Sequence, residues 1–521
     1  MHRTRRAALV TVFALLLALI APALAGAGTA SSAGTPRPVM IKPDPYEPDD
    51  TTATAKVLPE YSVHTIDNSS SPMGGHFVPD VDMFKLTAED TGTPWCIEAR
   101  QLAGYFACIM TASEVTSSGA LAQLDTSIGL WGLTIGNTMI FRAPHPGTFY
   151  VSLEPVLFGN GVYELKVTKG LAERVAGDNR YDTAAEVSHL MWPNAANPIA
   201  ELIAQIEDTS TLGPAGCVLA RGDDFADALA GSAFAGMVPH LGMPVLLTGR
   251  DQLPSVTMRE ILRLSQMRLW THQPFTVYIL GSETAVGRGV EDELRMFEAD
   301  DLVGLVHVVR LGGRNRFETA TRIAALEAST PIGTGNTAFL VNGFAFPDAL
   351  AAAPVASRAR GPVLMTRRLA LPFETKAFLL AHPEMHNVVV AGSASVVASS
   401  VLEELAAAPL SRNVIRLHGA DRYKTALKLA EFGVDKLGMN SEGMQVVSGA
   451  TFADGLSAGP MSAFTGAPLL LTRPSSLSTE VIGFYEEYGP GPGRRELPLY
   501  VVGGPAAVSD LAFDQLNDYW R

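Results

Sequence analysis

Apolar positions between residues 171 and 521 fall into short continuous runs that alternate with segments of helical period. Val306–Leu311 is such a run and predicts a strand. From 316 to 327 the apolar residues Ala320, Ile323 and Ala324 recur at helical spacing and predict a helix. The pattern continues with strands at 338–342, 362–365 and 387–390 and helices at 347–356 and 396–405. Alternation of this length predicts parallel sheets with right-handed crossovers.

Residues 41–170 have a different texture. Short alternating or aromatic runs, such as 95–99, 148–153 and 161–167, are separated by Pro, Gly and Asp, and no long helical period is present. Several short strands spaced by turns predict an antiparallel β-sandwich. The expected fold is therefore multidomain, with this sandwich followed by α/β units.

An internal repeat organises the α/β part, because four sequence elements recur three times in the same order. The first is Arg-x-x-Gly-x-Asn/Asp-Arg-Tyr/Phe-x-Thr-Ala, starting at Arg174, Arg310 and Arg416. The other three are a Gly-x-x-Phe-x-Asp element, a proline-led apolar run ending in threonine, and a strand followed by a glycine turn. The polar and glycine positions so defined are Arg180, Asp227, Thr248 and Gly281; Arg316, Asp348, Thr366 and Gly392; and Arg422, Asp454, Thr472 and Gly504.

These positions follow predicted strands, which places them at the carboxyl edge of a parallel sheet. Ligands bind at that edge, because helix amino termini and their free N–H groups point there. An arginine beside such N–H groups suits phosphate or carboxylate. Two interpretations stay open: the residues contact a polymer, or the arginines pair with the aspartates and hold the repeats together. The aspartates also begin helices, where they favour the helix dipole.

Composition narrows the class of protein. At 521 residues the chain exceeds one hydrophobic core, and 47% hydrophobic with 18% charged residues is typical of a folded protein. The formal charge of −14 argues against nucleic acid, which requires a basic surface. Only nine of the 39 basic residues are lysine, and arginine is the better bidentate partner for anions.

The first 25 residues predict an export signal. Arg3, Arg5 and Arg6 precede an apolar run at 7–20, and Ala23-Leu24-Ala25 is a small-residue cleavage pattern. A membrane anchor is the alternative, but the run is short for a span and no second one occurs, so we expect no span in the mature chain. Residues 26–40, rich in small residues and proline, predict a flexible linker.

Cys96 and Cys108 lie in the β-rich part. A hairpin centred near Leu102 would place them opposite each other and predicts a disulfide, which an exported protein can form. Two small buried thiols are the alternative. Cys217 opens an apolar strand and is expected to be an unpaired core residue.

The combined motifs between residues 171 and 521 resemble the cell-wall-binding repeat of Gram-positive surface proteins and autolysins. The resemblance implies three Rossmann-like domains, at 171–309, 310–415 and 416–521, in a pseudo-threefold arrangement. It also implies non-covalent attachment to an anionic wall polymer, teichoic-acid-like or another secondary wall polymer. Residues 41–170 resemble, more weakly, the pre-peptidase C-terminal β-sandwich, through the segments 46–50, 80–84, 146–151 and 161–165.

Sandwiches similar to this domain sometimes hold calcium, which prefers six to eight oxygen ligands. Two acidic clusters supply candidate ligands, and an ordinary solvated turn is the alternative. The candidates are Glu47, Asp49, Asp50, Asp80 and Asp82. No other cofactor is expected.

The expected function is that of a secreted, wall-bound surface protein without enzymatic activity. After the signal, the sandwich and the three repeats, no stretch of 100 residues is left for a catalytic domain. The alternatives are an accessory or processing product of a wall hydrolase, and an adhesin whose ligand is bound by the sandwich.

Overall fold

The computed structural model describes the greater part of residues 55–519. The described ranges are 55–57, 62–69, 72–73, 76–77, 82–92, 94–104, 108–118, 120–128, 137–155, 160–192, 213–237, 242–268, 274–298, 306–330, 333–490 and 498–519. The predicted signal peptide and linker lie outside them.

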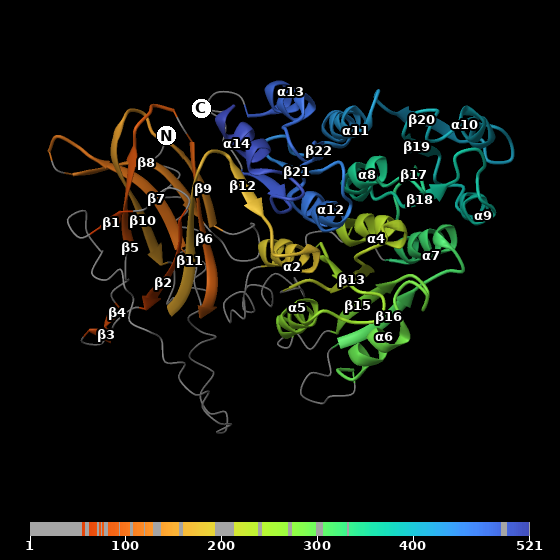
Figure 1. The fold of residues 1–521 in the computed structure, drawn as a ribbon, viewed down its shortest axis with the longest axis horizontal. Helices are drawn as coiled ribbons and strands as arrows, with labels where there is room; N and C mark the ends of the chain where they lie inside the picture. Colours follow the sequence, from red (N-terminus) through yellow and green to blue (C-terminus); the bar gives the residue numbers. More distant parts are fainter. Residues whose placement is uncertain are drawn as a thin grey trace, which may run out of the picture. The chain divides into compact units, whose positions relative to one another are not determined.

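The N-terminal part contains two β-sheets that share one core (Figure 1). One has the order β1 (Lys56–Val57), β5 (Asp82–Ala88), β10 (Gly147–Pro155), β7 (Cys108–Val115) and β8 (Leu121–Ile128). The other has the order β2 (Ser62–Ser69), β11 (Asn160–Lys169), β6 (Pro94–Gly104) and β9 (Asn137–Arg142). All pairs are antiparallel except β1 with β5. Between the sheets, Phe149 of β10 packs edge-on against Phe141 of β9 at 5.1 Å. A short hairpin joins β3 (Pro72–Met73) and β4 (His76–Phe77).

The predicted disulfide is wrong, because Cys96 is a free thiol and Cys108 is not among its strand neighbours. Cys96 is the third residue of the eleven-residue strand β6, and its neighbours across the sheet are Ile140 and Thr168. Cys108 is the first residue of β7 and pairs with Pro155. The chain travels about 25 Å along β6 after Cys96 before it turns. Cys96 is a buried free thiol, and burial raises its pKa.

The C-terminal part contains three parallel sheets of four strands each, in matching order. The first sheet runs β14 (Val245–Thr248), β13 (Gly216–Arg221), β15 (Phe275–Leu280), β16 (Val306–Leu311). The second runs β18 (Val363–Thr366), β17 (Thr337–Asn342), β19 (Asn387–Ala391), β20 (Asn413–Leu417). The third runs β22 (Leu469–Thr472), β21 (Met444–Ser448), β23 (Leu499–Val502), β12 (Ala172–Val175).

The fourth strand of each sheet comes from the opening motif of another repeat. β16 opens the second repeat but pairs with β15 of the first, and β20 opens the third repeat but pairs with β19 of the second. β12, which opens the first repeat, pairs with β23 at the end of the third. The three repeats therefore form a ring closed by strand exchange. The boundaries that the motif predicts at 310 and 416 pass through β16 and β20.

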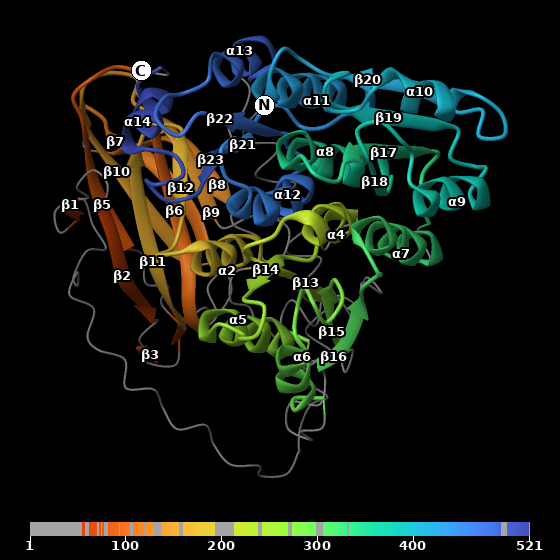
Figure 2. The same cartoon turned by 45° about the vertical axis from the view of Figure 1, so that its right-hand side comes forward.

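Three small-residue helices pack together where the repeats meet (Figure 2). They are α4 (Ala226–Met237), α8 (Phe346–Ala359) and α12 (Ala453–Thr465). The backbones approach so closely that a Cβ on Gly459 would lie 2.2 Å from Ser232 Oγ, and one on Gly236 would lie 2.5 Å from the Ala463 Cβ. Ser357 Oγ of α8 donates to the Ala233 carbonyl of α4 at 2.7 Å. These helices are apolar but short, and no described helix is long and apolar enough to cross a membrane.

Other helices begin at the motif or follow the later strands. Those that begin at the motif are α2 (Arg180–Met191), α7 (Arg316–Ser329) and α11 (Arg422–Leu437). The remaining ones are α5 (Ser255–Gln266), α6 (Arg288–Arg295), α9 (Phe373–Ala381), α10 (Ser399–Ala406), α13 (Thr479–Tyr488) and α14 (Asp510–Asp518).

Candidate binding site

The Asn/Asp-Arg pair of the motif marks a helix start. Asn179 and Asn315 each accept hydrogen bonds from two backbone N–H groups of the first turn, and Asp421 accepts one from Lys424. These residues are N-caps, which satisfy N–H groups that the helix leaves unpaired. The motif arginine is thus fixed as the first helical residue in every repeat, namely Arg180, Arg316 and Arg422.

Each of these arginines binds the Gly-x-x-Phe-x-Asp loop of its own repeat. Nη1 donates to the carbonyl of the loop glycine, at 2.5 Å for Arg180 with Gly222 and at 2.6 Å for Arg422 with Gly449. The bond from Arg316 to Gly343 is 2.5 Å long. Arg180 and Arg422 are exposed and Arg316 is half-buried. Among the described residues, the other N–H groups of the three guanidiniums have no hydrogen-bond acceptor.

The phenylalanines of the same loops meet at one point. Phe225, Phe346 and Phe452 come from different repeats, and each pair of ring centroids is 5.7 Å apart. Arg316 lies over Phe225 and Arg422 over Phe346, both at 6.0 Å. The arginine of one repeat therefore lies over the ring of the preceding repeat, and the threefold relation of the rings brings the three carboxyl edges together.

The aspartates of these loops also connect neighbouring repeats. Burial raises the pKa of Asp227, and a hydrogen bond from Thr319 and the charge of Arg316 oppose the rise. Asp348 has a raised pKa for the same reason, opposed by Thr425 and Arg422. Each aspartate thus faces the threonine and arginine of the next repeat.

In the third repeat, burial raises the pKa of Asp454 to about 6, and the charge of Arg180 opposes the rise. This is the contact that closes the ring between the last repeat and the first. The arginine charges act on these aspartates across the repeat boundary, and whether the arginines serve mainly to hold the repeats together stays a prediction.

The glycine turns are shaped by the same carboxylates. A Cβ on Gly281, with φ +90°, would lie 2.4 Å from Asp227 Oδ2, and one on Gly392, with φ +114°, would lie 2.9 Å from Asp348 Oδ2. The equivalent position in the third repeat is Gly503, with φ +123° and Asp454 Oδ2 at 2.7 Å, not Gly504 as the motif alignment predicts. At all three positions, the positive φ and the nearby carboxylate both favour glycine over a residue with a side chain.

The raised pKa of Asp454 predicts a pH-dependent stability. Between its ordinary value of 3.8 and its native value of about 6, the native state holds a proton that the unfolded chain releases. The stabilisation is complete below pH 4 and is lost as the pH rises through 6, by about 3 kcal/mol. We expect Asp454→Asn to gain stability relative to the wild type between pH 4 and pH 7.5. Thermal unfolding at both pH values checks this, and the exposed control Asp178→Asn should show no such gain.

The three threonines predicted for the site do not belong to it, because they are fully buried. Thr248 Oγ1 donates to the Gly249 and Gln252 carbonyls at 3.1 and 3.2 Å, within its own loop. Thr366 and Thr472 make equivalent bonds in their repeats. The hydroxyl at the end of β14, β18 and β22 thus shapes the loop that follows and is closed to solvent.

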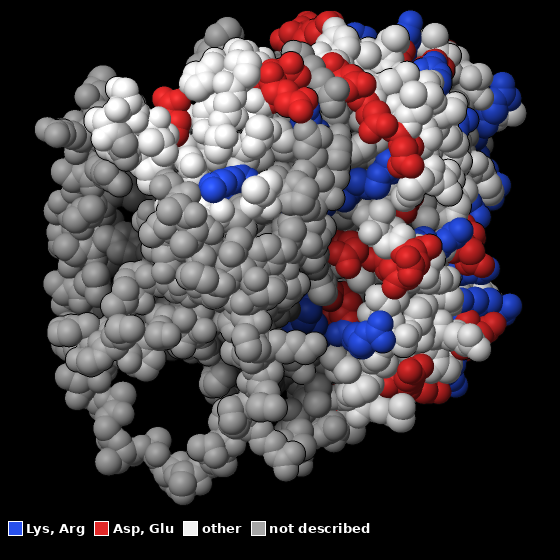
Figure 3. Space-filling view, turned by 60° about the vertical axis from the view of Figure 1, so that its left-hand side comes forward, with Lys and Arg blue, Asp and Glu red and all other residues white. Residues whose placement is uncertain are grey.

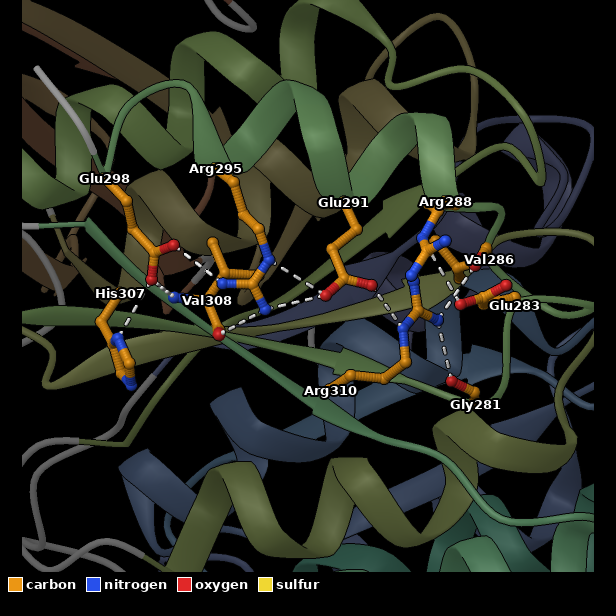
Figure 4. A network of polar contacts seen from close by, with 10 residues as sticks. All are labelled: Gly281, Glu283, Val286, Arg288, Glu291, Arg295, Glu298, His307, Val308 and Arg310. Atoms are coloured by element: carbon orange, nitrogen blue, oxygen red, sulfur yellow. Dashed lines mark hydrogen bonds and ion pairs between the residues drawn. The ribbon is translucent and has the colours of Figure 1, made fainter.

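Sequence reasoning gave no role to the first arginine of each motif, which secures the exchanged strand. Arg310 of β16 donates through Nη1 to the carbonyls of Gly281 and Val286, at 3.0 and 2.9 Å, and through Nε to Glu291 at 2.7 Å (Figure 4). Arg416 binds the equivalent carbonyls of Gly392 and Val397, both at 2.8 Å. The sequence feature that could have indicated this role is the position of the first motif arginine at the end of the opening strand.

In the first repeat, Arg174 makes the same bonds to the end of the chain. Its Nη1 donates to the carbonyls of Gly503 and Val508, at 2.9 and 2.7 Å. Its guanidinium also lies 4.7 Å from the centre of the Phe513 ring of α14.

The predicted calcium ligands are mostly outside the described residues. Only Asp82 of the five falls within them, where it is buried in β5. No group of three or more His, Cys, Asp or Glu in the described part of the chain is arranged to hold a metal ion. Calcium binding stays a prediction.

On the face shown in Figure 3, charged side chains of both signs are interspersed. Acidic and basic side chains lie side by side over its described residues, without a continuous basic stripe. Anion binding on such a surface depends on particular arginines rather than on a general potential.

Comparison with known proteins relates the ring to one family. The family described as "Cell wall binding domain 2 (CWB2)" matches residues 174–291, 310–402 and 416–512, which is more than half of the chain. The N-acetylmuramoyl-L-alanine amidase LytC of Bacillus subtilis (strain 168) is 25% identical over 349 residues, covering 66% of this chain and 58% of the relative. The amidase enhancer of the same strain is 25% identical over 307 residues, covering 59% and 35%. The chain thus spans 58% of the length of one relative and 35% of the other.

Two solved structures share the fold. Cwp8 from Clostridium difficile superposes with a TM-score of 0.52 at 24% identity, covering 67% of this chain and 52% of that one. Cwp6 from Clostridium difficile gives a TM-score of 0.51 at 16% identity, covering 82% and 66%.

Proposed function

Because this chain belongs to the cell wall binding domain 2 family, we propose that its three repeats hold it non-covalently on the wall through an anionic wall polymer. The observation that carries the proposal is the meeting of the three carboxyl edges around Phe225, Phe346 and Phe452. Each edge presents a motif arginine with one N–H group held by a glycine carbonyl and further donors without an acceptor among the described residues.

The negative net charge of the chain implies that an anionic polymer is bound through a few well-placed arginines. The chain has a formal charge of −14, and loss of the predicted signal with its three arginines makes this about −17. Net charge therefore repels an anionic polymer, and binding depends on oriented guanidinium groups that form paired hydrogen bonds to phosphate or carboxylate. Three edges also allow one long polymer to be held at several points, which multiplies weak contacts.

The export of the chain through residues 1–25 is part of the same proposal, since a wall polymer lies outside the membrane. The chain then acts as a binding protein that displays its N-terminal β-sheets at the cell surface. The family match lies in the repeats, which supports a binding function there.

A role as an accessory of a wall hydrolase is the second candidate. The names of the two curated relatives, an amidase and an amidase enhancer, favour it. If it holds, adding the purified protein to a wall amidase should accelerate wall lysis, whereas a passive wall protein should leave the rate unchanged.

The test of the main proposal is sedimentation with isolated walls. We expect residues 171–521 to sediment with walls and residues 41–170 to remain in solution. Walls stripped of their anionic polymer should retain little of the protein, and added salt should weaken binding because exposed ionic contacts are screened. A folded 171–521 that ignores intact walls would show that the repeats serve another purpose.

A further inference from the structure

The three carboxyl edges differ at two positions that the motif leaves free. The residue after the loop glycine is Asp223 in the first repeat, Phe344 in the second and Ala450 in the third. The residue after the buried threonine is Gly249, Arg367 and Arg473, respectively. Since both positions flank the motif arginine, the repeats present different surfaces to a ligand.

In the second repeat the two positions place an exposed aromatic ring and an arginine beside the motif arginine. The Phe344 ring is 56% exposed, and the guanidinium of Arg316 lies 4.6 Å from its centre. The guanidinium of Arg367 lies 5.9 Å from the same ring and 4.9 Å from the Phe317 ring. Phe317 supports Phe344 edge-on at 6.0 Å.

The Arg367 side chain is exposed, and no acceptor for its guanidinium is found among the described residues. Two more exposed apolar side chains follow it in the chain: Leu369, which is 64% exposed in the next loop, and Phe373, which is 80% exposed at the start of α9. A hydrogen bond of 2.9 Å from Asn315 to Glu374 places the start of α9 next to the motif of this repeat. Apolar side chains gathered beside free cations at the surface indicate a binding function.

At the equivalent positions the first repeat has an acidic residue and a glycine in place of the aromatic ring and the second arginine. Asp223 forms an ion pair with Arg221, and its charge also faces Arg180. Asp224 stands next to it, and Gly249 supplies no cation. The acidic loop therefore competes with any anion for the motif arginine.

The third repeat is intermediate. Arg473 lies 4.4 Å over the Tyr423 ring but also lies 3.9 Å from both Asp421 and Glu480. Ala450 provides no ring.

We infer that the second repeat alone carries a complete subsite for a negatively charged sugar unit, in which the Phe344 ring packs against the sugar and Arg316 and Arg367 bind its phosphate or carboxylate. The C–H bonds on one face of a pyranose form an apolar surface that gains dispersion contacts on an aromatic ring. The planar guanidinium groups supply paired donors for the anion. The inference rests on the proposed function and names the unit of the polymer that is held most tightly.

The test uses the full mature chain and substitutions that import residues from the other repeats. We expect Phe344→Asp and Arg367→Gly each to weaken binding to isolated walls by about tenfold or more, and the double variant to approach background. The matched control Ala450→Asp makes the same change in the third repeat and should alter binding less than about twofold. Because Phe344 and Arg367 are exposed, the thermal unfolding of the variants should match that of the wild type.

Competition identifies the ligand chemistry. N-acetylglucosamine 6-phosphate should displace the wild type from walls at lower concentration than inorganic phosphate or N-acetylglucosamine. Equal competition by inorganic phosphate would overturn the role of the ring. A Phe344→Asp deficit that persists on polymer-stripped walls would place a wall protein on the subsite and overturn the inference. Wild-type binding with unchanged binding by both variants refutes the inference alone, whereas a wild type that ignores walls refutes the proposed function as well.

Discussion

Substituting Arg174→Ala together with Val175→Pro is expected to unfold the sheet at the far end of the chain. β12 is the fourth strand of the third sheet, where the Val175 carbonyl accepts from the Gly503 N–H at 2.9 Å. Arg174 adds bonds to two carbonyls of the β23–α14 connection. A proline removes a strand N–H and the alanine leaves two carbonyls unpaired, a combined loss of about 5 kcal/mol, comparable to the stability of a domain.

Hydrogen exchange read by mass spectrometry locates the damage. We expect protection to be lost in β23 and α14, both more than 300 residues from the substitutions, and in the neighbouring strand β21. The corresponding pair Arg310→Ala and Leu311→Pro should affect β13 and β15, which precede it in the chain. Asp178→Ala, in the exposed loop after β12, is the control and should leave exchange unchanged. Wild-type protection of β23 in the first variant would contradict closure of the ring by β12.

The order of strands and helices was predictable because each element has its own hydrophobic period. The helix predicted at 316–327 is found as Arg316–Ser329, and the strand at 338–342 as Thr337–Asn342. The exchange of strands was not predictable, since a repeated motif defines a unit of sequence but not the copy with which each strand pairs. β16 carries the same apolar pattern whether it pairs with its own repeat or with the preceding one.

The errors share one physical cause, which is that proximity was inferred from the local sequence. Cys96 and Cys108 are close in the chain, but β6 and β7 belong to different sheets. Thr248 follows a strand at the correct edge, yet its hydroxyl turns into its own loop. Conversely, Phe344 and Arg367 occupy positions that vary between repeats, so a search for repeated residues passes over them.

The largest expected effect on function is the loss of wall binding when Arg180, Arg316 and Arg422 are all replaced by alanine. The replacement removes the guanidinium donors from all three edges. It also leaves Asp227, Asp348 and Asp454, which are largely buried, without the opposing charges of the next repeat. A buried carboxylate without a partner costs about 1–3 kcal/mol or more, so the triple variant should also be less stable.

Adding Asp→Asn at those three aspartates to the triple arginine variant separates the loss of wall binding from the loss of stability. The sixfold variant has no unpaired buried carboxylates, so we expect its thermal unfolding to return toward that of the wild type, while sedimentation with walls stays at background. Replacing the three arginines by lysine keeps the charge but loses the planar fork, and should bind walls weakly, with a steeper dependence on salt. If the sixfold variant regains both stability and wall binding, the arginines serve only to join the repeats. Retained stability without binding instead assigns them to the polymer, because the contacts between repeats are then no longer the cause.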